Sequence, residues 1–267
     1  MILVTGATGF LGSELIRQLL LKGEKVRAIK RDTSKIPEIL KEETSIEWHN
    51  ADILDYFALK DAMEDISRVY HCAAMISFKP SDKKQMLKVN VEGTVNMLNL
   101  CMEFNIDKFL HVSSVASIGD SKKGALIREE DHWEFNSSQS AYSVSKHESE
   151  MEVFRAGAEG LKTVIINPSV IIGKNAGNEG SGKLFNALQK GLSYYPQGSF
   201  GYIDVNDVAK TMILLMESDI FDERFIISAE NWTHKDLFTE ISEQFGRKAP
   251  SFALKPWMLQ LAYFGTQ

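Results

Sequence analysis

Ile2-Leu3-Val4-Thr5-Gly6-Ala7-Thr8-Gly9-Phe10-Leu11-Gly12 joins an apolar run to three regularly spaced glycines. The apolar run predicts a short buried strand, and the segment after Gly9 predicts a helix. Gly6 allows a tight turn, Gly9 lets the backbone approach a pyrophosphate, and Gly12 permits close packing of the helix on the strand. The amino terminus of the helix offers free N–H groups to phosphates. The residues predicted to contact a dinucleotide at this turn are Gly6, Thr8, Gly9, Phe10, Leu11 and Gly12.

The alternation of short β-branched runs with longer amphipathic segments continues along the chain. Expected strands cover residues 2–5, 25–30, 46–49, 68–72, 108–113 and 163–167. Expected helices cover residues 11–22, 54–63, 83–104 and 140–158. Strands that alternate with helices predict βαβ units and a parallel sheet covered on both faces. The fold class is therefore α/β, a doubly wound parallel (Rossmann) sheet that binds ligands beyond the carboxyl ends of its strands.

After the sixth expected strand the pattern changes, and a stretch rich in Gly, Asn and Ser follows. Expected elements beyond it are helices at residues 183–190, 204–217 and 234–245 and a strand at 224–228. We assign residues 1–172 to the Rossmann domain, with 202–228 returning to it. Residues 173–201 and 229–267 form a small substrate-binding lobe. An apolar helix expected from Pro256 onward ends abruptly, so we expect this lobe to be truncated at the C-terminus.

Composition excludes several classes of protein. The 267 residues carry a net charge of −6 with no basic run, which argues against nucleic-acid binding. Cys72 and Cys101 form no disulfide pattern, and the histidines show no metal-ligand spacing with them. Apolar stretches fall short of the roughly 18 residues needed to cross a bilayer. With no export signal at the amino end, we expect a cytoplasmic protein with no membrane partner and no metal.

The end of the second expected strand bears on the choice of dinucleotide. Lys30 and Arg31 stand there beside Asp32. An acidic side chain about 20 residues after the glycines binds a ribose 2′-hydroxyl and favours NAD. A guanidinium binds a 2′-phosphate through paired N–H donors. Two adjacent cations favour NADP(H), while NAD(H) remains possible because Arg31 and Asp32 are equally well spaced.

Tyr142 and Lys146 are four residues apart, so on a helix they share one face. The pair is common by chance and becomes specific only together with the glycine turn. With both, the chain resembles the extended short-chain dehydrogenase/reductases of the NAD-dependent epimerase/dehydratase family. It is most similar to the branch of dihydroflavonol reductases and 3β-hydroxysteroid dehydrogenases, and the resemblance runs over essentially all 267 residues.

Further motifs carry this resemblance in the expected order. His71-Cys72-Ala73-Ala74 resembles the family's H-x-A-A, and Asn90-Val91-Glu92-Gly93-Thr94 resembles its N-V-x-G-T. Asp52-Ile53 is similar to the step that holds adenine, and Glu130 with Trp133 is similar to a stretch of the reductase branch. The remaining cofactor contacts that the resemblance implies are Asp52, Ile53, Cys72, Ala73, Ala74, Asn90, Val112, Tyr142, Lys146, Pro168 and Ser169.

The resemblance implies a catalytic set of Ser114, Tyr142 and Lys146. Ser114 is preferred to Ser113 because the family's catalytic hydroxyl lies five residues before a glycine that matches Gly119. A tyrosine pKa of about 10 must fall for acid–base work near neutrality, and ~2 units correspond to ~2.7 kcal/mol. A cation about 5 Å away supplies ~3 kcal/mol at an effective dielectric near 20. Lys146 is therefore expected to lower the pKa of Tyr142.

These residues predict an NADP(H)-dependent oxidoreductase that reduces an aldehyde or ketone, or oxidises a secondary alcohol, with Tyr142 as proton donor or acceptor. One alternative is an NAD-dependent nucleotide-sugar epimerase on the same fold, and another is a non-catalytic dinucleotide sensor. Sugar dehydratases are disfavoured because Val115-Ala116 stands where they carry an acidic pair. The expected partners are a small-molecule substrate and a second copy of the chain. The resemblance places this homodimer interface on the helices that contain residues 86–104 and Tyr142.

Overall fold

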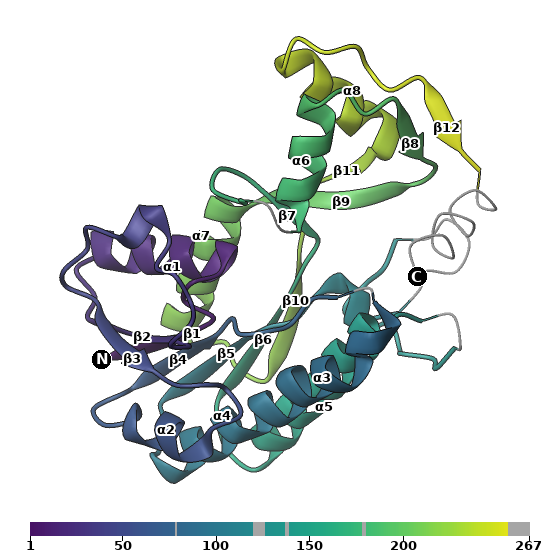
Figure 1. Cartoon of the computed structure of the whole chain (residues 1–267). Helices are drawn as coiled ribbons and strands as arrows, with labels where there is room; N and C mark the ends of the chain where they lie inside the picture. Colours follow the sequence, from purple (N-terminus) through teal and green to yellow (C-terminus); the bar gives the residue numbers. More distant parts are fainter. Residues whose placement is uncertain (78, 120–125, 137–138, 178–179, 256–267) are drawn as a thin grey trace. The chain divides into compact units, whose positions relative to one another are not determined.

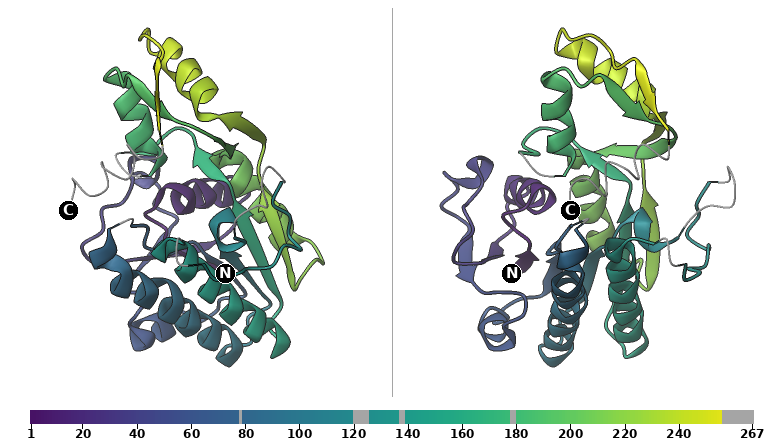
Figure 2. Two further views of the ribbon diagram at one scale, coloured as in Figure 1. Left: turned by 90° about the vertical axis from the view of Figure 1, so that its right-hand side faces the viewer. Right: turned by 45° about the vertical axis from the view of Figure 1, so that its right-hand side comes forward.

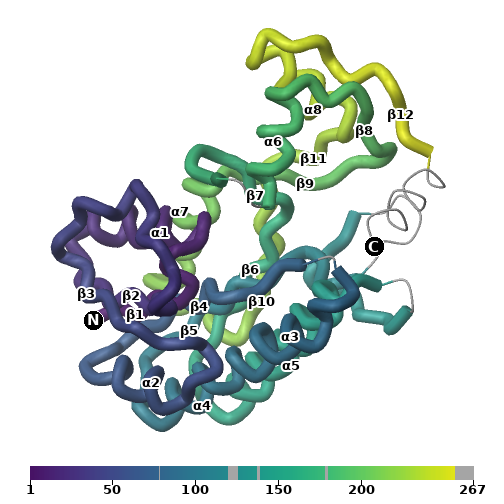
Figure 3. The backbone as a smooth tube through the Cα atoms, in the orientation of Figure 1, coloured from purple at the N-terminus to yellow at the C-terminus, as the bar shows by residue number. Residues whose placement is uncertain are grey.

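The computed structural model describes residues 1–77, 79–119, 126–136, 139–177 and 180–255 (Figure 1). The apolar helix expected from Pro256 lies outside the described residues. The chain forms two compact units, and each is discontinuous in sequence. The first unit contains Met1–Pro168 and Val205–Ile227, and the second contains Ser169–Asp204 and Ser228–Gln267. The trace in Figure 3 shows the chain leaving the first unit after β6 and returning to it at α7.

The first unit is built on a seven-stranded sheet whose neighbouring strands are all parallel. Its strands are β1 (Ile2–Thr5), β2 (Val26–Lys30), β3 (Glu47–Asn50), β4 (Arg68–His71), β5 (Lys108–Val112), β6 (Thr163–Pro168) and β10 (Glu223–Ile227). The strand order is β10-β6-β5-β4-β1-β2-β3, so the chain reverses its direction of winding between β1 and β4. The predicted doubly wound sheet is confirmed. Ligands of such sheets bind beyond the strand ends at this reversal.

Helices cover both faces of this sheet (Figure 2). They are α1 (Phe10–Leu21), α2 (Tyr56–Asp61), α3 (Lys83–Leu87), α4 (Gly93–Glu103), α5 (Ala141–Ala158) and α7 (Val205–Glu217). On one face α4 packs against α5, and on the other α1 packs against α7. None of the helices within the described ranges is long and apolar enough to span a membrane.

The single helix expected over residues 83–104 is wrong in one respect. A π-helical turn, Lys88–Glu92, separates α3 from α4 and contains the buried Asn90. A π turn inserts one residue into the helical repeat, and the apolar spacing of the sequence does not reveal so local a change. Such turns are frequent at functional sites.

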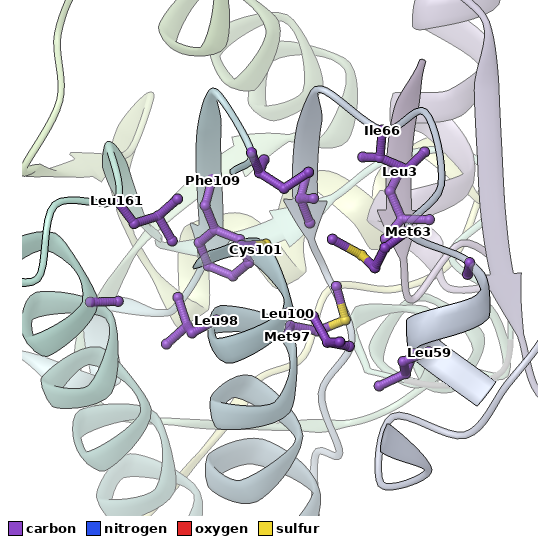
Figure 4. Close-up of a cluster of buried hydrophobic side chains, with 14 of the residues drawn as sticks. Leu3, Leu59, Met63, Ile66, Met97, Leu98, Leu100, Cys101, Phe109 and Leu161 are labelled. Carbon is purple, nitrogen blue, oxygen red and sulfur yellow. The ribbon is translucent and has the colours of Figure 1, made fainter. Parts of the chain in front are cut away.

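A large apolar core lies between the sheet and the helices α2, α4 and α5 (Figure 4). Leu3 and Phe109 come from the sheet, whereas Leu59, Met97 and Leu98 come from the helices, and all five are fully buried. Burial of each such side chain contributes about 1.5–3 kcal/mol relative to exposure. The core therefore fixes the sheet, and with it the positions of the loops at the strand ends.

The second unit contains a three-stranded sheet in the order β11-β9-β7 and a two-stranded sheet of β12 and β8. Its elements are β7 (Val170–Ile172), α6 (Ser181–Gln189), β8 (Tyr194–Pro196), β9 (Ser199–Asp204), β11 (Glu230–Thr233), α8 (His234–Gln244) and β12 (Phe252–Leu254). Sequence analysis found both helices but none of these short strands. Residues 169–172, 202–204 and 228 were expected in the first unit, whereas the structure groups them with the second, where β7 pairs with β9.

Candidate active site

The glycine turn between β1 and α1 leaves no room for a side chain at Gly6 or Gly12. Gly6 has a φ of +65°, and a Cβ built there would lie 2.6 Å from the backbone nitrogen of Ala73. A Cβ on Gly12 would lie 2.3 Å from the Gly6 carbonyl oxygen. No side chain caps α1 at Gly9, so the first-turn N–H groups have no side-chain acceptor there. The turn therefore fits the close approach of a phosphate group to a helix amino terminus.

His71, at the end of β4, supports this turn through hydrogen bonds of both its ring nitrogens. Its Nδ1 lies 2.9 Å from the Thr5 hydroxyl, and its Nε2 lies 3.1 Å from the Thr94 hydroxyl. Thr94 donates its proton to the Asn90 carbonyl at 2.6 Å, so Nε2 of His71 is the donor and Nδ1 accepts from Thr5. Burial lowers the pKa of His71 to about 3, which keeps the ring neutral. The sequence motif identified His71 without its role as a support of the turn.

The candidate catalytic hydroxyls meet at the carboxyl end of β5. Ser114 caps a 3₁₀ turn, Val115–Ser117, by accepting from the Ala116 N–H at 3.2 Å, and its side chain lies near enough to Tyr142 to lower the pKa of that phenol. Tyr142 stands in the first turn of α5, where the Ser140 hydroxyl caps the helix by accepting from the Ser143 N–H at 3.0 Å. Residues 28 positions apart in the sequence thus come close together at this end of the sheet.

Lys146 lies one helical turn beyond Tyr142 and is buried. Its Nζ donates to the Val112 carbonyl at 2.7 Å. Burial lowers the pKa of Lys146 to about 8, partly opposed by the Glu150 carboxylate.

The expected lowering of the Tyr142 pKa by Lys146 is not what the structure shows. Burial raises the pKa of Tyr142, and the hydrogen bond from Ser114 opposes that rise. Desolvation is the largest influence on the pKa of both groups, and the attraction of the cation alone does not include it.

The remaining predicted cofactor residues lie mostly around the same strand ends. Cys72, Ala73 and Ala74 follow β4 directly. Asn90 is buried and binds the backbone of Met75 twice, accepting from its N–H at 2.7 Å and donating to its carbonyl at 3.0 Å. Asn90 therefore fixes the loop that follows β4.

The predicted adenine and selectivity residues follow β2 and β3. Asp52 is exposed, and its carboxylate accepts from the Leu54 N–H at 2.9 Å. Ile53 is buried beneath Gly93, where a Cβ would lie 2.9 Å from the isoleucine side chain. Lys30 is half-buried and Arg31 exposed.

Pro168 and Ser169 stand at the boundary of the two units. Pro168 ends β6 in the first unit, while Ser169 begins the second. Within the described residues, no group of three or more His, Cys, Asp or Glu side chains could hold a metal ion.

Comparison with known proteins agrees with this architecture. The model of the NAD dependent epimerase/dehydratase family matches residues 2–227. Sterol demethylase protein B of Methylococcus capsulatus is 30% identical over 263 residues, which cover 97% of this chain and 78% of the relative. A putative dihydroflavonol 4-reductase of Synechocystis is 30% identical over 261 residues, covering 96% of this chain and 75% of the relative.

Solved structures share the fold. The crystal structure of gox2253 matches with a TM-score of 0.89 at 30% identity, covering 100% of this chain and 81% of that one. The UDP-glucose 4-epimerase of Thermus thermophilus, solved in complex with NAD, matches with a TM-score of 0.81 at 23% identity over 100% of this chain and 93% of that one. The family match, the parallel sheet and the glycine turn agree, and the chain belongs to the NAD-dependent epimerase/dehydratase family of extended short-chain dehydrogenase/reductases.

Proposed function

We propose that the protein is an NADP(H)-dependent oxidoreductase that interconverts a carbonyl compound and a secondary or primary alcohol. The observation that carries the proposal is the placement of Ser114 beside Tyr142, where it lowers the pKa of the phenol, one helical turn before the buried Lys146. Two hydroxyl groups in contact can both reach one substrate oxygen, and the ammonium beside them favours negative charge that develops there.

Each candidate catalytic residue has a separate role in this reaction. A dinucleotide held at the glycine turn of Gly6, Gly9 and Gly12 would supply hydride to the carbonyl carbon. The Ser114 hydroxyl donates a hydrogen bond to the carbonyl oxygen and orients it, and the Tyr142 hydroxyl gives that oxygen its proton. The Lys146 ammonium favours the negative charge that develops on the substrate oxygen and would bind the nicotinamide ribose. Alcohol oxidation runs through the same contacts in reverse, with Tyr142 as the base.

The preference for NADP(H) rests on Lys30, which ends β2, and on Arg31, which follows it. Arg31 is exposed, so its guanidinium is accessible to a 2′-phosphate. The neighbouring Asp32 carboxylate accepts from the Asn50 amide at 3.4 Å. That contact draws the carboxylate toward β3, which supports Arg31 over Asp32 as the group that meets the adenosine ribose.

The substrate class is proposed from the names of relatives together with the chemistry of the site. The relatives named as dihydroflavonol 4-reductase and sterol demethylase protein B suggest a carbonyl on a bulky apolar ring system. The second unit carries exposed aromatic side chains, Tyr194 and Phe200, that an apolar ring could contact. We assign substrate binding to this unit.

Carbonyl-dependent NADPH oxidation by wild type and Tyr142→Phe tests the proposal. A screen of aldehydes, diketones, ketosteroids and flavonoid-like ketones should find a substrate, with NADH weaker. Tyr142→Phe should lose at least about 10³-fold in kcat and keep the Kd for NADPH. Unchanged turnover in that variant would disprove the mechanism. A non-catalytic sensor would show no turnover in either protein, and an epimerase would release tightly held NAD on denaturation.

A further inference from the structure

Glu150 is a fully buried carboxylate two turns beyond Tyr142 on α5. Its Oε1 accepts from the Ser117 hydroxyl and, at 2.5 Å, from the Asn167 amide. Both partners also reach the carbonyl of Ser114, Ser117 at 2.7 Å and Asn167 at 3.0 Å. Through these two partners, Glu150 therefore fixes the 3₁₀ turn that Ser114 caps.

The other carboxylate oxygen faces Arg224 of the edge strand β10. Oε2 of Glu150 lies 3.4 Å from the Arg224 guanidinium, whose exposed fraction is 18%. The same guanidinium donates to the carbonyl of Glu129 at 2.8 Å and to that of Asp131 at 2.9 Å. Glu129 returns the contact, because its carboxylate accepts from the Ile226 N–H at 2.9 Å. Arg224 thus fastens the segment 129–131 to the sheet edge.

This segment leads directly to a contact beside Lys146. The Trp133 indole stacks on the His147 imidazole with ring centroids 4.4 Å apart and planes 6° from parallel. The same indole lies 3.9 Å from the position of a Cβ on Gly119, which has a φ of +104°. Glu150, Arg224 and Trp133 therefore form one continuous path, from the Ser114 turn around to the residue that follows Lys146.

A buried ion pair contributes little net stability, because desolvation of the two charges offsets their attraction. The ion pair instead fixes geometry. A buried charge without a hydrogen-bond partner is costly, so the groups around each charge are held in place. We propose that Glu150 is a positioning residue that joins Ser114, Arg224 and the segment 129–133 into one preorganised support for Tyr142 and Lys146. This inference rests on the proposed oxidoreductase function, and the three contacts of the carboxylate carry it.

Glu150 also acts on Lys146 through its charge. The titratable groups near Lys146 are His71 and His111 of the sheet, Cys72 of the loop after β4, and Tyr142 and Glu150 of its own helix. Burial keeps His71 and His111 neutral and raises the pKa of the Cys72 thiol to about 12, whereas the Glu150 carboxylate raises the pKa of Lys146. Its loss should lower the pKa of Lys146 and move the high-pH limb of kcat to lower pH.

Three variants test the proposal, each assayed for kcat, KM, the Kd for NADPH and amide hydrogen exchange of peptides within residues 126–136. Glu150→Gln keeps the shape and removes the charge. Arg224→Met removes the guanidinium and leaves the carboxylate. Glu152→Gln is the matched control, since Glu152 pairs with Arg155 on the same helix and is partly exposed. A surface pair of this kind contributes little.

We expect kcat to fall about 10- to 100-fold in Glu150→Gln and Arg224→Met, with the Kd for NADPH unchanged within about twofold. Exchange within residues 126–136 should quicken in both, whereas the high-pH limb should shift only in Glu150→Gln. Glu152→Gln should match wild type. Wild-type kcat with an unmoved pH limb in a folded Glu150→Gln protein overturns the inference, and if that variant does not fold, wild-type kcat and exchange in Arg224→Met overturn it. Absence of Tyr142-dependent turnover in the wild type would defeat the proposed function instead, while hydrogen exchange would still test the support.

Discussion

At Gly12 a single added carbon atom, the Cβ of alanine, is expected to weaken cofactor binding. A methyl group there would sit 2.3 Å from the Gly6 carbonyl oxygen, so the turn or the first turn of α1 must move. We predict that Gly12→Ala weakens NADPH binding by at least about 100-fold, or about 2.8 kcal/mol, measured by calorimetric titration. Gly23→Ala is the control at the other end of α1: nothing lies within 4 Å of its Cβ, and its φ of +79° costs stability alone. Equal NADPH affinity in the two variants would contradict the assignment of the turn.

Burial of Lys146, a candidate catalytic residue, opposes folding. Its pKa is about 8 in the folded chain against a usual 10.5. Below pH 8 the lysine is charged whether folded or unfolded, and the folded state bears the full cost of burial. Between these pKa values the unfolded chain binds the proton that the folded chain has lost, so stability rises with pH.

We therefore predict that wild type gains about 1–3 kcal/mol of unfolding free energy relative to Lys146→Met as pH rises from 8 to 10.5. Urea unfolding of the two cofactor-free proteins in parallel measures this difference, and other titrating groups cancel between them. Lys146→Met should also lose turnover at every pH. A stability difference that does not change with pH would mean that Lys146 keeps an ordinary pKa in the fold.

At the scale of elements, α5 presents Tyr142 from its first turn, and Ser140 holds that turn. We predict that Ser140→Ala lowers stability by about 1 kcal/mol and lowers kcat, because a frayed first turn misplaces the phenol. Asp55→Ala removes the equivalent cap of α2, where the Asp55 carboxylate accepts from the Ala58 N–H at 3.1 Å. Thermal unfolding should show similar losses in both variants, and only Ser140→Ala should lose activity. A parallel loss of kcat in Asp55→Ala would show that the effect is general destabilisation.

The elements also show what sequence patterns can predict. Strands and helices of the first unit lie within a few residues of expectation because their apolar periodicity reflects burial in one large core. The strands of the second unit are three to six residues long, and β11, Glu230–Thr233, is polar at three of its four positions. Backbone pairing rather than side-chain pattern forms such strands, so single-sequence periodicity misses them.

The residues of the candidate site also differ in whether a local sequence pattern can predict them. Glycine spacing and the Tyr142–Lys146 pair are local patterns, and the family resemblance added Ser114. Glu150 and Arg224 are 74 residues apart, and no spacing rule links a buried carboxylate to a guanidinium across that distance. The position of Glu150, four residues after Lys146, was the one local indication. The predicted homodimer and the substrate role of the second unit remain predictions.

The whole molecule depends on a late return of the chain to the first unit. β10 comes from residues 223–227, yet it pairs with β6 along its length and completes the sheet. Lys108, buried in β5, donates to the carbonyls of Leu215 and Ser218 at 2.6 and 2.8 Å, which fixes the end of α7. The first unit is therefore a folding unit only when both of its segments are present.

This organisation predicts that cofactor binding and substrate binding can be separated. A shortened protein that joins residues 1–168 to 205–227 through a flexible Gly/Ser linker keeps all seven strands and the glycine turn. It should fold cooperatively and bind NADPH with a Kd near that of the full chain, as calorimetric titration would show, while carbonyl-dependent NADPH oxidation is lost. Residues 1–168 alone should aggregate, because β6 becomes an unpaired edge and α1 loses the cover of α7. Full turnover by the shortened protein would remove the second unit from substrate binding, since the first unit would then contain everything the reaction needs.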